Sequence, residues 1–201
     1  ELPRELLFER FVSCKTALTC EEVERTYGSG DELGTKALDH HFKNLFICED
    51  ANLTTEKIEK IILKSELKIG SKPKLVIIDY VQLIRSTGEG RYEKASNVAE
   101  DLKRIARSTG TVIIVASQRS RPEKQRSDKS PPRIEVGLHD AKESGSLENS
   151  SGVVIGAWRD RSDASCVWLR VLKSTKGGAG KTTACNFNGE HMKITERANC
   201  P

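Results

Sequence analysis

The chain lacks several features that would place it in other classes of protein. No apolar run approaches the roughly 20 residues that a membrane-spanning helix needs, so we expect no membrane segment. The opening residues, ELPRELLFERFVS, are acidic and amphipathic, unlike a secretory signal peptide. None of the six cysteines stands at CxxC spacing, which leaves a zinc site with little support. We therefore expect reduced thiols in a cytoplasmic protein.

The bulk composition fits one soluble globular domain. The 201 residues suffice for a sizeable core, and 36% of them are hydrophobic while 31% are charged. The net charge of +4 is too modest to identify a partner. Because the first residue is glutamate rather than methionine, we expect a fragment or a processed product.

Hydrophobic periodicity predicts alternating strands and helices. Residues 75–78 (LVII), 111–118 (TVIIVASQ) and 152–158 (GVVIGAW) form apolar, β-branched runs, which are typical of strands buried on both faces. Between the first two runs, apolar residues recur at helical spacing over residues 92–106. Strand, helix and strand of these lengths predict a right-handed parallel βαβ unit. Further elements are expected as helices over residues 2–14, over 32–42 and after Thr54, and as a short strand over 46–48.

The C-terminal part has a different pattern, and it contains a stretch with the letters of a phosphate-binding loop. Alternation over residues 166–173 and short apolar segments after it predict an antiparallel β-hairpin within residues 165–195. The stretch itself, KGGAGKTT, runs from Lys176 to Thr183. A phosphate loop needs a buried strand before it and a helix after it. Asn186, Asn188 and Gly189 instead favour a turn, so we interpret KGGAGKTT as a hairpin turn, with a true phosphate loop as the alternative.

Two polar residues end the first two predicted strands. Asp79 follows LVII, and Gln118 closes TVIIVASQ. In open α/β sheets, ligands bind outside the carboxyl ends of the strands. A carboxylate there suits a magnesium ion on nucleotide phosphates, and a glutamine can bond to a phosphate oxygen or a water. The alternatives are an aspartate that caps the next turn and an ordinary polar strand end.

A basic segment, RSRPEKQRSDKSPPR, follows the second predicted strand over residues 119–133. Apart from prolines it has no apolar residue, so it is expected to be a loop rather than a core element. It is either a solvated linker or an electrostatic contact with nucleic acid. Its six basic residues are Arg119, Arg121, Lys124, Arg126, Lys129 and Arg133.

Several of these segments together resemble a known family. IIDYVQLI (77–84), ASQRSR (116–121), DAKESGSLENS (140–150) and WRD (158–160) resemble, in order, the motifs of the hexameric replicative DNA helicases, the DnaB-like members of the RecA-like ATPase group. DYVQL and ESGSLE are the most specific parts. The resemblance implies one RecA-like motor domain over residues 1–201. Such a domain is α/β, with a mostly parallel twisted sheet, helices on both faces and a C-terminal antiparallel β-hairpin edge.

The resemblance also implies roles at an ATP site. Glu1 would polarise the attacking water as a general base. Asp79 would hold Mg²⁺ through water, and Gln118 would sense the γ-phosphate. Lys173, with Lys176 as a partial substitute for a missing arginine, would reach the ATP of a neighbouring subunit. ATP and Mg²⁺ are therefore the implied cofactors.

The implied partners are single-stranded DNA and further copies of the chain in a hexameric ring. Lys142, Glu143 and Gly145 match the family's inner-channel DNA loop, so residues 119–150 are expected to face the DNA. The basic loop has few aromatic residues for base stacking, so its contact is expected to be electrostatic and salt-sensitive. Its contacting residues would be Arg119, Arg121, Lys124 and Arg126.

Three departures from the family's pattern keep alternatives open. The family's phosphate loop would lie before Glu1, outside this chain. Lys173–Ser174–Thr175 keeps the lysine of a Lys-x-Arg pair but has no arginine finger, and Lys142 replaces an arginine with loss of bidentate geometry. We therefore expect the chain alone to hydrolyse ATP poorly or not at all. The alternatives are a non-catalytic subunit that binds DNA or packs into a ring, and another RecA-group ATPase such as a recombinase.

Overall fold

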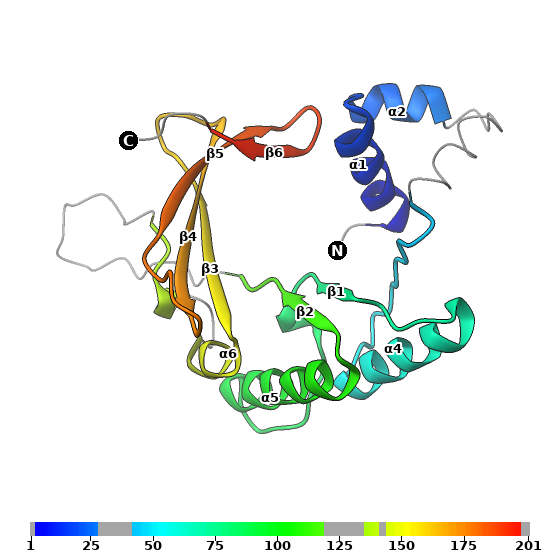
Figure 1. The fold of residues 1–201 in the computed structure, drawn as a ribbon, viewed down its shortest axis with the longest axis vertical. Helices are drawn as coiled ribbons and strands as arrows, with labels where there is room; N and C mark the ends of the chain where they lie inside the picture. The colour runs from blue at the N-terminus through cyan, green and yellow to red at the C-terminus, as the bar shows by residue number, and fades with distance from the viewer. Residues whose placement is uncertain (1–2, 28–41, 119–134, 141–143, 198–201) are drawn as a thin grey trace. The chain divides into compact units, whose positions relative to one another are not determined.

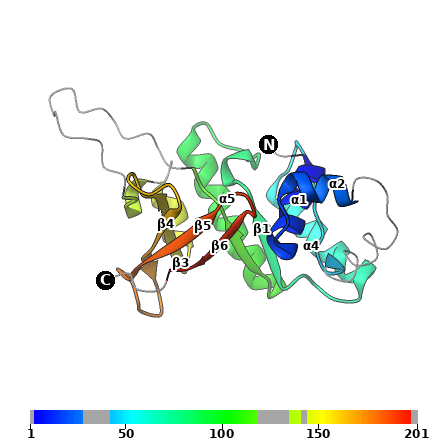
Figure 2. The ribbon, with the colours of Figure 1, turned by 90° about the horizontal axis from the view of Figure 1, so that it is seen from above.

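The structure, a computed structural model, describes residues 3–27, 42–118, 135–140 and 144–197 (Figures 1 and 2). The chain divides into two compact units, each of which is treated by itself. The first comprises Glu1–Glu49, Arg159–Trp168 and Thr183–Pro201, and the second comprises Asp50–Trp158 and Leu169–Thr182. Among the described residues, no helix is long and apolar enough to cross a membrane.

A parallel βαβ unit lies at the centre of the second unit, as the periodicity predicts. The strands β1 (Leu75–Ile78) and β2 (Val112–Val115) pair in parallel, with Leu75 opposite Val112 and Ile78 opposite Val115. The helix α5 (Arg91–Thr109) connects them, and α4 (Thr55–Ile69) precedes β1. Figure 1 shows α4 and α5 on one side of the β1–β2 pair.

Local chemistry explains where these helices begin and end. The Thr54 side chain accepts a hydrogen bond from the Lys57 backbone N–H, so it is the N-cap that the sequence predicts. Both helices stop at glycines in the left-handed region, Gly70 with φ 77° and Gly110 with φ 70°. The 3₁₀ turn η1 (Val81–Leu83) then carries the chain away from β1.

One face of the parallel pair packs on the core of this unit. The core consists of buried side chains from α4, α5, β1 and η1, and three half-buried strand residues pack against it. Ile62 and Ile105 are among the largest fully buried side chains. Burying each such side chain contributes about 1.5–3 kcal/mol. The core residues are Ile58, Ile62, Ile78, Val81, Ile84, Val98, Leu102 and Ile105, and the strand residues are Val76, Ile113 and Val115.

The other face of the parallel pair contradicts the expectation of strands buried on both faces. Leu75 and Ile77 are 47% and 64% exposed, and Val112 and Ile114 are 60% and 52% exposed. Successive side chains of a strand point to opposite faces. Within the described residues only one face is packed against the core cluster, so every second apolar side chain stays exposed. The third predicted strand is present as β3 (Val153–Arg159), but its expected burial on both faces is wrong in the same way, because alternate positions along it are exposed.

The remaining strands form a four-stranded sheet with the order β3–β4–β5–β6. The strands β5 (Thr182–Asn188) and β6 (Lys193–Glu196) are antiparallel, with Cys185 opposite Glu196. The predicted antiparallel C-terminal hairpin is therefore present. β3 (Val153–Arg159), expected as a further buried strand, pairs with β4 (Cys166–Ser174) in this sheet.

Two helices of the first unit pack around a small cluster. α1 (Arg4–Thr16) and α2 (Cys20–Tyr27) bury Val12 and Val23, and the Phe8 and Phe42 rings meet edge to face with centroids 5.5 Å apart. The helix α2 begins with a capping box: Thr19 Oγ1 accepts from the Glu22 N–H, and the Glu22 carboxylate accepts from the Thr19 N–H.

The structure differs from the sequence-based expectation between α2 and α4. The strand expected over residues 46–48 is wrong, because these residues have no regular secondary structure. The apolar run there is too short to specify a strand without a partner to pair with. The helix expected over residues 32–42 lies outside the described residues, except for Phe42.

Candidate nucleotide site

The carboxyl ends of β1 and β2 bring Asp79 and Gln118 to one edge of the parallel pair. Asp79 directly follows β1, and Gln118 lies shortly after β2. The backbone ties these two chain segments together beyond the strands. The Ala116 N–H donates to the Ile78 carbonyl at 2.9 Å, and the Val81 N–H donates to the Ala116 carbonyl at 2.9 Å. The juxtaposition that the sequence predicts is therefore present.

The surroundings of Asp79 fit a magnesium ion bound with a nucleotide. The Asp79 side chain is exposed, and no described residue forms a hydrogen bond or ion pair with its carboxylate. The described residues also contain no cluster of three or more His, Cys, Asp or Glu that would hold a metal by themselves. Mg²⁺ prefers one or two carboxylates together with waters and phosphate oxygens over an all-protein cage. A single free carboxylate at a strand end fits that preference.

Gln82 belongs to the same edge, although sequence reasoning assigned it no role. Its side-chain Nε2 donates to the Ser117 Oγ at 3.1 Å, which joins η1 to the residue that precedes Gln118. Its Oε1 is buried and has no hydrogen-bond partner among the described residues. The motif DYVQL contains Gln82, but the contact depends on a residue 35 positions away. Only the pairing of β1 with β2 reveals it.

Lys173, expected to reach a neighbouring subunit, is engaged within its own chain. It lies on β4, and its ammonium donates to the Glu148 carbonyl at 2.5 Å, near the end of α6 (Ser144–Ser150). A lysine at the last carbonyls of a helix is favoured by the helix dipole.

KGGAGKTT forms a turn between two strands, as the sequence predicts. The Val171 N–H donates to the Lys181 carbonyl at 2.9 Å, and the Gly180 N–H donates to the Val171 carbonyl at 2.7 Å. Gly177, Gly178 and Gly180 have φ values of 88°, 85° and 88°, which residues with a side chain rarely adopt. The last two threonines of the stretch already belong to β5, where a phosphate loop would lead into a helix, and Lys176 is exposed on the turn.

Most of the predicted DNA-contacting residues lie outside the described residues. Gly145 is the exception: it lies on α6, and a Cβ added there would be 3.4 Å from the Tyr92 hydroxyl of α5, so the two helices approach closely. The predicted DNA contacts outside the described ranges are Arg119, Arg121, Lys124, Arg126, Lys142 and Glu143. Glu1, the predicted general base, also lies outside them.

Comparison with known proteins decides the family. The family model described as "DnaB-like helicase C terminal domain" matches residues 1–196. The chain belongs to this family. The replicative DNA helicase DnaC of Bacillus subtilis is 37% identical to the DnaB-like domain over an alignment of 141 residues. The alignment covers 66% of the domain and 29% of that relative. A probable plasmid replicative DNA helicase of Chlamydia trachomatis is 28% identical over 171 residues, 80% of the domain and 35% of that relative.

Solved structures show that the DnaB-like domain has the RecA-like α/β fold of helicase ATPase domains. A structure of a DnaB-like replicative helicase, described with its interactions with primase, matches with a TM-score of 0.79 at 23% identity. It covers 98% of the domain and 49% of that chain. A second structure, of an ATPase domain, matches with a TM-score of 0.78 at 24% identity, covering 98% and 72% of the two chains. These matches confirm the predicted fold class.

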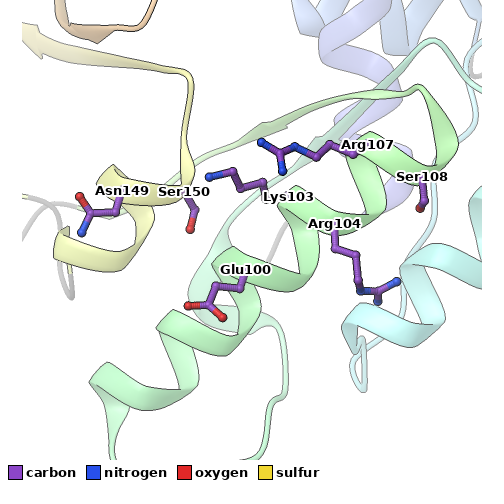
Figure 3. Close-up of a pocket in the computed structure, with 7 residues that line it drawn as sticks. All are labelled: Glu100, Lys103, Arg104, Arg107, Ser108, Asn149 and Ser150. Carbon is purple, nitrogen blue, oxygen red and sulfur yellow. The ribbon is translucent and has the colours of Figure 1, made fainter.

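The DnaB-like domain also has a groove that contains none of the predicted ATP-site residues. Its volume is about 760 Å³, and it lies between α5 and the end of α6 (Figure 3). Lys103 points toward Ser150, whereas Arg104 points toward α4 and bonds to Glu59 at 3.2 Å. The groove is therefore a basic surface of the helix pair, separate from the edge that carries Asp79. Its lining residues are Glu100, Lys103, Arg104, Arg107, Ser108, Asn149 and Ser150.

The WRD segment, one of the family-like motifs, has a structural part in the turn between β3 and β4. The Asp160 carboxylate accepts from the Ser162 Oγ at 2.6 Å, the Trp168 Nε1 at 2.9 Å and the Ser162 N–H at 2.8 Å. These donors hold the pKa of the Asp160 carboxyl well below its usual range, the Ser162 hydroxyl first. Asp160 therefore stabilises the β3–β4 turn of the DnaB-like domain, and both of its carboxylate oxygens accept hydrogen bonds there.

Proposed function

We propose that this DnaB-like domain is the motor domain of an ATP-dependent DNA helicase. ATP hydrolysis at the subunit interfaces of a hexameric, cytoplasmic ring would drive movement along single-stranded DNA. The observation that carries the proposal is the placement of Asp79 and Gln118 at adjacent carboxyl ends of a parallel strand pair. In open α/β sheets this edge is where phosphate ligands bind. The domain covers 29% and 35% of the two relatives described above, so the activity proposed belongs to the intact protein.

Each predicted residue has a part in this proposal. Asp79 would hold Mg²⁺ through water, and such an ion would supply positive charge beside the ATP phosphates. Gln118 bonds to the γ-phosphate region and passes its state to the segment that follows it. Glu1 orients the attacking water and accepts its proton. Lys173 and Lys176 supply positive charge to the ATP of the neighbouring subunit.

Single-stranded DNA is the proposed substrate of the ring. The basic residues after Gln118, together with Lys142, Glu143 and Gly145, contact successive phosphates. Such contacts release counterions, so affinity falls steeply as salt concentration rises and depends little on sequence. The basic residues are Arg119, Arg121, Lys124 and Arg126.

The experiment that tests the proposal measures ATP turnover by the intact protein with single-stranded DNA present. Asp79→Asn removes the charge that holds the ion, and it is expected to lower kcat about a hundredfold or more. Gln118→Ala is expected to reduce stimulation by DNA more than turnover without DNA. Lys103→Ala, on the exposed part of α5, serves as the control and should behave like the wild type. Unchanged turnover in Asp79→Asn would contradict the proposal.

A second candidate function rests on one specific observation. Lys173–Ser174–Thr175 carries no arginine, and Lys173 bonds to the Glu148 carbonyl. This arrangement fits a subunit that binds DNA or packs into a ring without hydrolysing ATP. DNA binding by the intact protein with no ATP turnover above that of Asp79→Asn would favour this candidate.

A further inference from the structure

We propose that Gln82 is a positioning residue that couples the segment carrying Gln118 to the segment carrying Asp79. The inference rests on the proposed function, because both segments are assigned there to ATP hydrolysis. Gln82 need not touch the nucleotide for this role. It acts through Ser117, the residue directly before Gln118.

The backbone on either side of Asp79 is bonded to the segment that follows β2. Ala116 bonds to Ile78, immediately before Asp79, and to Val81, which follows two residues after it. The carboxylate-bearing turn is therefore fixed against Ala116. Gln118 lies two residues beyond Ala116 along the chain.

A side-chain contact between Gln82 and Ser117 extends this backbone link by one residue. Gln82 Nε2 donates to Ser117 Oγ at 3.1 Å. Ser117 is itself exposed, so packing does not hold it in place. This contact ties the turn after β1 to the residue before Gln118. Loss of it would free Ser117 and Gln118 together.

The buried amide oxygen of Gln82 is unfavourable for packing. In the part of the chain that the structure describes, the buried Gln82 Oε1 has no hydrogen-bond partner. Rotating the amide by 180° would exchange the two atoms and leave the nitrogen unpaired, so one polar atom lacks a partner in either orientation. A buried polar atom without a partner is unfavourable for stability and is rare in folded proteins. A glutamine at this position is therefore not explained by packing, for which leucine or methionine would serve better.

The consequence for catalysis is geometric. A small displacement of a group that senses or orients reacting atoms can lower turnover by a large factor, while ground-state binding changes little. Gln82 is therefore expected to affect kcat more than KM. Its effect should also disappear once Ser117 can no longer accept the hydrogen bond.

The test is a double-mutant cycle in the intact protein, measured as ATP turnover with saturating single-stranded DNA. Gln82→Leu and Ser117→Ala are each expected to lower kcat about tenfold, the factor that corresponds to one lost hydrogen bond, with KM for ATP unchanged within about twofold. The double variant should be no slower than either single variant, because both remove the same contact. Ser117→Thr, which keeps the hydroxyl, should restore turnover, and Ser86→Ala is the matched control for loss of an exposed hydroxyl.

Several results would overturn the inference. Additive losses in the double variant, a change confined to KM, or wild-type turnover in both single variants would each contradict it. A fall in Tm of several degrees for Ser117→Ala with no change in kcat would assign the contact to stability alone. Absence of turnover in the wild-type protein would contradict the proposed function as well, whereas normal turnover in Gln82→Leu with loss in Asp79→Asn would contradict this inference alone.

Discussion

At the scale of single residues, the carboxylates of the domain have two different roles. Some stabilise the fold through hydrogen bonds, and another is available to bind a ligand. Asp160 accepts three close hydrogen bonds in the β3–β4 turn, whereas Asp79 has no partner among the described residues. Both aspartates stand in family-like motifs, DYVQL and WRD, but only Asp79 was predicted to hold a ligand. The difference depends on Trp168 and Ser162, whose approach to Asp160 follows from the turn.

Asp160 leads to a prediction about stability and pH. Because hydrogen bonds depress the folded-state pKa of Asp160, its contribution to stability is present above the unfolded-state pKa of about 3.9. That contribution is lost progressively as pH falls below about 4 toward the folded-state pKa. Asp160→Asn cannot titrate, so its Tm should fall less steeply than that of the wild type between about pH 5 and pH 2. Thermal unfolding followed by circular dichroism measures both curves.

A second carboxyl, that of Asp163, limits the expected difference between the Tm curves of the wild type and Asp160→Asn. Its pKa is also depressed, by the Ser165 hydroxyl first and then by Arg197. Asp160→Asn should therefore keep part of the acid sensitivity rather than abolish it. Parallel curves for the variant and the wild type would contradict the assignment of Asp160.

At the scale of elements, the helices were more predictable than the burial of the strands. Thr54 and the apolar spacing of α5 indicate the helices because caps and periodicity are local properties. An apolar β-branched run does not say whether one face or both faces are covered. The exposed Ile77 and Ile114 depend on what packs against the sheet, which is a property of the tertiary structure.

The helix α4 provides a matched pair of substitutions that tests its packed face. Ile62 is 1% exposed and belongs to the core, whereas Leu67 is 87% exposed on the same helix. Ile62→Ala should lower the free energy of unfolding by about 2–5 kcal/mol, through lost burial and the cavity left behind. Leu67→Ala should change it by no more than about 0.5 kcal/mol. Urea unfolding of the two variants checks the difference, and equal effects would contradict the packing described for α4.

The turn between β4 and β5 gives a second prediction for an element. Lys181 lies in a hairpin turn, so Lys181→Ala should leave ATP turnover by the intact protein unchanged. Lys176→Ala should lower it, because Lys176 is one of the two lysines proposed to reach the ATP of a neighbouring subunit. Steady-state kinetics on the two variants distinguishes them. Loss of turnover in Lys181→Ala alone would restore the interpretation of KGGAGKTT as a phosphate loop.

At the scale of the whole molecule, ordered motifs identify the family and fold, while the site needs the structure. DYVQL and ESGSLE point to a DnaB-like domain, which the family match over residues 1–196 shows. The strand ends predicted Asp79 and Gln118 as neighbours because parallel strands share their carboxyl edge. The contact of Gln82 with Ser117 could not be predicted, since it joins two side chains through a strand register that the sequence does not state.

The central claim is that this domain uses the edge carrying Asp79 to couple ATP hydrolysis to single-stranded DNA. The measurement that tests it most directly is the rate of ATP hydrolysis by the intact protein and by Asp79→Asn, each with and without single-stranded DNA. DNA is expected to accelerate hydrolysis by the wild type, and Asp79→Asn is expected to show almost no turnover in either condition. Turnover in Asp79→Asn that equals the wild type and rises equally with DNA would contradict it.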